Sequence, residues 1–445
     1  MIHTQVKDGL KPASFGQAPH HEGAGGFFWL SAFWFIYCAR PEDYIPLVGY
    51  IPLAKITALF AFMALLMSAG TAKRKLPREG WYLIALILYM MVTSILSPVW
   101  KSGALNHTID FAKGGVAWVL TYLLVTNFVR LRRIIFIQAA SVAMVAAVSV
   151  VKGRNTPRLE GVLNGMYDNA NDLAFALALS LPFCLAFLLQ ARSTIRKIFW
   201  LGCMLIMVAA LFLTASRSGF IVLVISGVVL LWHFGVKGKR PMLIVSSLLF
   251  VAIVTAAAGG HLTKRFEAIG GNYDSEDQSA YGSFEDRKAL MIHAAEAMLH
   301  YPLWGVGCKN FVTYSGEWRE VHNAYLQIGA EGGIPAFILY ILFFRAGFKN
   351  LAKLRKREDL PPNIVYFVWA LHSSLIAFVV GAFFGPEAYQ LFSFIAVAQT
   401  SVLLAIIEEN ATAEASPVPR KSNFAWYDRY RSPAGALSNP RPAPR

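Results

Sequence analysis

Residues 172–191 read DLAFALALSLPFCLAFLLQA, an almost unbroken apolar run. A helix needs about 20 such residues to cross the core of a bilayer. Similar runs recur along the 445-residue chain, which is 56% hydrophobic and only 15% charged. Soluble domains carry a larger charged fraction. The sequence therefore predicts an all-α integral membrane protein that crosses the bilayer many times.

Twelve spans are predicted from these apolar runs. Their residues are 26–39, 51–69, 81–97, 115–129, 134–151, 172–191, 198–215, 218–236, 241–259, 334–348, 364–385 and 388–407. Most connections are short, but residues 260–333 form one large polar insertion between spans nine and ten. The predicted parts are a leader (1–25), spans one to nine (26–259), the insertion, spans ten to twelve (334–407) and a disordered tail (408–445).

Lysine and arginine residues predict the orientation of the chain in the membrane. Alternate connections are strongly basic, as in TAKRKLPRE (71–79) and RAGFKNLAKLRKRED (345–359). Basic loops remain on the cytoplasmic side. Both termini are therefore predicted to be cytoplasmic and the large insertion periplasmic. This distribution accounts for most of the net charge of +15, so nucleic-acid binding is not needed to explain it.

Arginines on the predicted outer side need another explanation, and one lies in TASRSGF (214–220). Arg217 stands there between two spans with almost no loop. It either extends to the interface as an anchor or pairs with an anion in a cavity. The flanking serines and glycine suit the close approach of a phosphate, because they add donors and remove bulk.

The insertion contains SFEDRKALMIHAAEAMLHYP (283–302), which predicts a helix capped by Ser283 and ended by Pro302. Arg287 lies near its N-terminal end. An apolar stripe follows, made of Leu290, Met291, Ala294, Ala295 and Met298. Two placements fit this pattern equally well. The helix either lies on the membrane surface or packs on a small core within the insertion.

Two further segments place polar groups at the outer interface. The first, RLEGVLNGMYDNANDLAF (158–175), offers Arg158 and Asn171, although asparagines before an apolar run often only cap a helix. The second, VHNAYLQIGAEGG (321–333), offers His322, Asn323, Tyr325 and Glu331. An interfacial histidine is more often structural than catalytic, but its pKa range suits a general base. The glycines predict a helix break after Tyr325.

Several of these motifs together resemble one family. HNAYLQIGAEGGIPAF (322–337), the SRSG hairpin, EDRKALM (285–291) and YPLWGVGCKNF (301–311) are similar to segments of bacterial O-antigen ligases and O-antigen polymerases. The resemblance covers about residues 155–350, and the twelve-span layout matches as well. The acidic segment GGNYDSEDQSAYGS (270–283) departs from the motifs of the family, which leaves the acceptor undefined.

The resemblance implies a GT-C-like membrane glycosyltransferase of the bacterial inner membrane. Its donor would be a glycan on undecaprenyl pyrophosphate, and its acceptor a sugar hydroxyl such as one on lipid A-core. No metal and no cofactor is expected. His322 would be the catalytic base. The pyrophosphate would be held by Arg217 and Arg287, with Arg265 and Arg158 as further candidates. The groups expected to orient the base or bind sugar are Asn323, Tyr325, Glu331 and Asn171.

Other functions remain open at this stage. An O-antigen polymerase or a protein O-oligosaccharyltransferase would use the same donor and differ in the acceptor. A transporter of lipid-linked glycans is a different class. Transporters tend to carry polar or helix-breaking residues near the bilayer midplane, in paired repeats. Here the polar groups gather at the outer rim, which favours chemistry on one face of the membrane.

Overall fold

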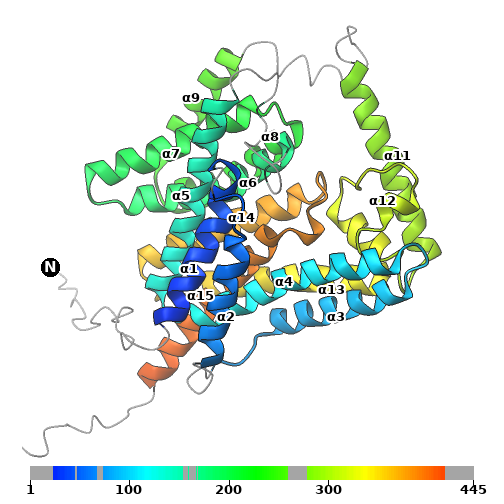
Figure 1. The fold of residues 1–445 in the computed structure, drawn as a ribbon. Coiled ribbons are helices and arrows are strands. Elements are labelled where there is room, and N and C mark those ends of the chain that lie inside the picture. The colour runs from blue at the N-terminus through cyan, green and yellow to red at the C-terminus, as the bar shows by residue number, and fades with distance from the viewer. Residues whose placement is uncertain are drawn as a thin grey trace, which may run out of the picture. The chain divides into compact units, whose positions relative to one another are not determined.

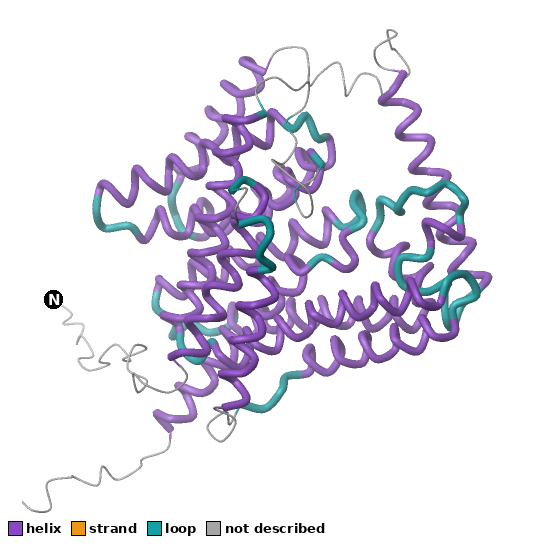
Figure 2. Tube along the Cα trace, viewed as in Figure 1, coloured by secondary structure: helices purple, strands orange, loops and turns teal. Residues whose placement is uncertain are grey.

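The computed structural model describes residues 24–45, 48–67, 74–153, 159, 167, 169–258 and 278–415. Within these ranges the chain is helical, with loops and no strand, as Figure 2 shows. The long helices are α1 (Ala24–Ala39), α2 (Leu53–Met67), α3 (Arg78–Leu96), α4 (Lys101–Leu124), α5 (Phe128–Lys152), α6 (Ala170–Gln190), α7 (Thr194–Leu213), α8 (Arg217–Leu231), α9 (Pro241–Ala258), α11 (Gln278–His300), α13 (Ala324–Arg355), α14 (Pro362–Gly381) and α15 (Leu391–Ala415). Short turns are η1 (Pro41–Asp43), η2 (Trp232–Lys237), α12 (Phe311–Tyr314) and η4 (Glu387–Tyr389).

Asparagine and serine side chains begin several of these helices. Asn127, Asn169, Ser216 and Asn323 each accept a hydrogen bond from a backbone N–H in the first turn of α5, α6, α8 and α13. These N–H groups have no partner within the helix itself, so a capping oxygen stabilises each start by about 1 kcal/mol. Asn171 does not cap α6, because Asn169 fills that position.

Eight described helices are long and apolar enough to cross a membrane, which confirms a multi-pass, all-helical membrane protein. They are α3, α5, α6, α7, α8 with η2, α13, α14 and α15. The first two predicted spans fall on α1 and α2, which are apolar but shorter. The count of twelve spans stays a prediction.

The predicted fourth span, 115–129, has the wrong boundaries. The helix α4 begins at Lys101, and α5 already starts at Phe128. The first half of α4 carries polar residues, including Asp110 and Lys113, which form an exposed ion pair one turn apart. These residues lower the mean hydropathy of the first half of α4 without breaking the helix. The apolar pattern in the sequence therefore indicated only the second half.

Within the insertion, α11 begins at Gln278, so the predicted start at Ser283 is wrong. No proline interrupts residues 278–282, and the helix continues through them. Its apolar stripe packs inward, because Leu290 and Ala294 are buried in one cluster with Val306 and Phe311. The structure therefore favours the second placement, a helix on a small core of the insertion.

A kink in α13 anchors that core to the membrane helices. Gly333 adopts φ 73° and ψ −177°, and Pro335 has no N–H to offer the carbonyl of Glu331. The N–H of Ile334 bonds to Pro302 instead. The carbonyls of Ala330 and Glu331 accept from the N–H groups of Val306 and Gly307, both at 2.9 Å. The backbone carbonyls exposed by this break therefore hold the turn at Gly305, Val306 and Gly307, called the GVG turn below.

The chain divides into two compact units, 1–406 and 407–445. In the first unit, α3 packs against α4 and α13, and α14 packs against α6 and α8 (Figure 1). The insertion helix α11 packs on α13. The starts of α6 and α8 and the turn at η4 meet at one end of this unit, where Asn171, Asp172, Ser218 and Glu387 line a cleft.

Candidate active site

Arg217 lies at the tight turn between α7 and α8. Ser216 caps α8 by accepting from the N–H of Gly219 at 3.1 Å, and it donates to Asn171 Oδ1 at 2.8 Å. Gly219 stands against Ala174 of α6, where a side chain would clash. The turn is therefore fastened to α6, and Arg217 occupies the first position of α8.

Arg287, in the insertion helix α11, interacts electrostatically with Arg217. The guanidinium of Arg287 is half-buried in α11. Burial lowers the pKa of Arg287, and the positive charge of Arg217 lowers it further. Two cations within electrostatic range disfavour each other in a partly dry site. An anion would relieve this repulsion.

His322 completes this group from the loop before α13. Burial lowers the pKa of His322, and the charge of Arg287 adds to the effect, so the imidazole is neutral near pH 7. Its Nδ1 lies 3.1 Å from the backbone carbonyl of Glu320. A carbonyl oxygen can only accept, so Nδ1 carries the proton and Nε2 keeps a lone pair. In this tautomer Nε2 can accept a proton.

Two ion pairs fasten the segment that carries His322. Arg319 Nη1 lies 2.6 Å from Asp286 Oδ2, next to Arg287 in α11. Lys309 Nζ lies 3.1 Å from Glu320 Oε1. Neither pair was found in the sequence, because the partners lie in separate loops whose approach only the folded insertion creates.

The other predicted residues of VHNAYLQIGAEGG hold the structure together. Asn323 caps α13, and the Tyr325 hydroxyl donates to the carbonyl of Val379 at 2.8 Å. Glu331 is buried and accepts from the Lys309 N–H at 2.8 Å and from the Tyr389 hydroxyl at 2.5 Å. Their roles in orienting the base or binding sugar stay predictions.

A cleft beside the α7–α8 turn adds a carboxyl pair that sequence reasoning missed. Asn171, Asp172, Ser218 and Glu387 line it together with Phe175, Phe384 and three glycines. Burial raises the pKa of Glu387 well above its ordinary value, and both the charge of Asp172 and a hydrogen bond to it add to this. The pair therefore holds a proton, and Glu387 can donate to Asp172.

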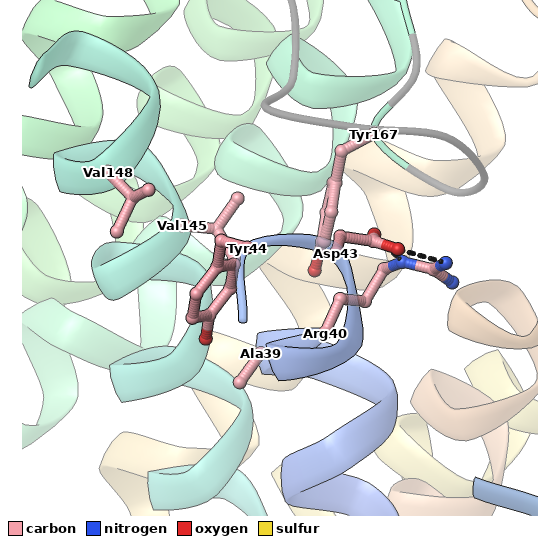
Figure 3. A pocket seen from close by; sticks show the side chains of 7 residues that line it. All are labelled: Ala39, Arg40, Asp43, Tyr44, Val145, Val148 and Tyr167. Carbon is pink, nitrogen blue, oxygen red and sulfur yellow. Dashed lines mark hydrogen bonds and ion pairs between the residues drawn. The ribbon is translucent and has the colours of Figure 1, made fainter. Parts of the chain in front are cut away.

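Other candidate positions contribute less. Arg158 and Arg265 lie outside the described residues. A second pocket, at the end of α1 and against α5, contains Arg40 paired with Asp43, with Tyr167 on one side (Figure 3). None of the predicted site residues lines it. In the described part of the chain, no three His, Cys, Asp or Glu residues gather closely enough to hold a metal ion.

Arg217, Arg287 and His322 all fall within residues 202–341, the segment that matches the family model for O-antigen ligase. This match supports an assignment of the chain to the O-antigen ligase family. No curated protein matches it. The O-antigen ligase segment runs from α7 through the insertion into α13, so it includes both the α7–α8 turn and the kink at Gly333. The family assignment and the electrostatic grouping thus concern the same part of the molecule.

Proposed function

We propose that this protein transfers a glycan from undecaprenyl pyrophosphate to a sugar hydroxyl of lipid A-core at the periplasmic face of the inner membrane. The observation that carries the proposal is the electrostatic chain from Arg217 through Arg287 to His322. The charge of Arg217 acts on Arg287, and the charge of Arg287 acts on His322, although the three residues come from distant segments of the chain. A diphosphate next to a reacting hydroxyl would match these charges.

His322 Nε2 would take the proton from the acceptor hydroxyl. The acceptor oxygen then forms a bond to the anomeric carbon, and the bond between that carbon and the diphosphate oxygen breaks. The leaving undecaprenyl diphosphate keeps the electron pair. The hydrogen bond from Nδ1 to Glu320 supports this role, because it holds the imidazole in the required tautomer.

Arg217 and Arg287 would stabilise the charge that grows on the leaving diphosphate. A guanidinium presents a planar fork that matches phosphate oxygens, and it is always charged. Two such groups can do what a divalent cation does elsewhere, so metal independence is part of the proposal. The partial burial of Arg287 supports it, since charges interact more strongly where water is excluded.

A ligase, a polymerase and an O-oligosaccharyltransferase differ in the acceptor, and one experiment distinguishes the three activities. The gene is deleted, and surface glycan is analysed on a gel after complementation with each variant. We expect the deletion to leave free lipid-linked polymer and bare core, which indicates a ligase. Single repeats on core would indicate a polymerase instead. Loss of glycan from proteins would indicate an O-oligosaccharyltransferase.

The same assay tests the base. His322→Ala should fail to complement at normal protein level, whereas His300→Ala, an exposed histidine at the end of α11, should complement fully. Transfer by His322→Ala would exclude His322 as the base. Unchanged surface glycan in the deletion strain would exclude the proposed function altogether.

A further inference from the structure

Lys309 holds a backbone conformation that side chains avoid. Its φ is 54°, in the left-handed region. The same loop has two other left-handed positions, Gly305 at 62° and Gly307 at 96°, and both are glycine. A non-glycine residue in this region costs about 1–2 kcal/mol. Lysine is therefore strained at this position.

Lys309 makes contacts with two acidic residues. Its N–H bonds to Glu331 Oε2, a contact that glycine would keep. Its ammonium pairs with Glu320, and the two side chains are 40% and 35% exposed. Burial works against the charge, but the Glu320 carboxylate outweighs it and raises the pKa of Lys309. Lys309 therefore remains charged and paired at neutral pH.

Glu320 connects this ion pair to the imidazole. Its carboxylate binds Lys309, while its backbone carbonyl accepts from His322 Nδ1. Fixing the side chain of Glu320 limits the movement of its own carbonyl. Lys309 is itself fastened to α13 through Glu331, so the connection runs from a membrane helix to the imidazole.

We infer that Lys309 is a positioning residue, which orients His322 by pinning Glu320 to the kinked part of α13. This inference rests on the proposed function, in which His322 is the base. Without Lys309, the loop would sample orientations in which Nε2 is misdirected. A small misplacement of a reacting group can lower a rate by about a hundredfold.

Lys309→Gly tests this cleanly, because it relieves strain, keeps the backbone hydrogen bond and removes only the ion pair. We expect kcat for glycan transfer by the full-length protein in membrane vesicles to fall at least about tenfold, with little change in the donor KM. Lys309→Met should behave alike, and Lys309→Arg should recover most of the rate. Hydrogen exchange in residues 319–323 should be faster in Lys309→Gly.

Trp318→Gly is the matched control, since Trp318 is also left-handed (φ 55°) and is 74% exposed. It should keep the wild-type kcat. In a His322→Ala background, Lys309→Gly should cause no further loss. A wild-type kcat in Lys309→Gly, or a rise in the donor KM alone, would overturn the inference while leaving His322 as the base. Transfer by His322→Ala alone would instead refute the base itself.

Discussion

The positive charge of Arg217, at the first position of α8, acts on Arg287 in the insertion helix α11. The two residues belong to different parts of the fold, and they repel each other. Repulsion of this kind destabilises the unliganded protein slightly and favours an anion between the two groups. The charge of a dianionic leaving group would offset this repulsion.

Replacing either arginine should therefore impair transfer even when the charge is kept. Arg217→Lys and Arg287→Lys lose the planar fork, and we expect each to lower kcat/KM by about a hundredfold. Arg192→Lys, an exposed position between α6 and α7, is the control. Initial rates with lipid-linked glycan measure the effect. Wild-type activity of Arg217→Lys would return Arg217 to the role of an interfacial anchor.

The pH dependence of transfer should report His322. Its pKa lies below the ordinary value of 6.5, first because of burial and then because of Arg287. The neutral form is the active one, so kcat/KM should stay level near pH 7 and fall only as the pH drops below about 6.5. In Arg287→Gln the lowering charge is absent, and the acidic limb should move to higher pH. An unmoved limb in that variant would contradict the proximity of the two groups.

The sequence predicted the membrane class, because apolar runs leave a local signal. The assignment of Arg217, Arg287 and His322 to one site stays a prediction. The carboxyl pair of Asp172 and Glu387 had no such signal, since its members are joined only when the turn after α14 meets α6. The roles of Glu331 and Tyr325 were equally hidden. Their polarity was visible, but their partners, Tyr389 and Val379, are distant in the sequence.

Glu331 is expected to contribute to the stability of the fold. Glu331→Ala leaves the Lys309 N–H and the Tyr389 hydroxyl without their acceptor, and two buried unsatisfied donors cost about 2–6 kcal/mol together. Glu331→Gln keeps one acceptor oxygen and should cost less. Thermal unfolding of the purified protein in detergent measures both. If Glu331→Ala unfolds at the wild-type temperature but raises the acceptor KM, the carboxylate contacts sugar instead.

The kink at Gly333 provides the last test, because the docking of the insertion depends on it. A Cβ there would lie 2.6 Å from the carbonyl oxygen of Leu303 and 2.7 Å from that of Pro302, in a backbone conformation that only glycine adopts readily. We expect Gly333→Ala to lower the free energy of unfolding by about 3 kcal/mol or more. Transfer should be abolished, because the GVG turn would no longer be held against α13. Gly202→Ala in α7, where nothing lies within 4 Å of the added carbon, should be neutral or stabilise by up to about 1 kcal/mol. The two variants are compared by unfolding temperature and by complementation. Equal stability of Gly333→Ala and Gly202→Ala would mean that the kink does not hold the insertion in place.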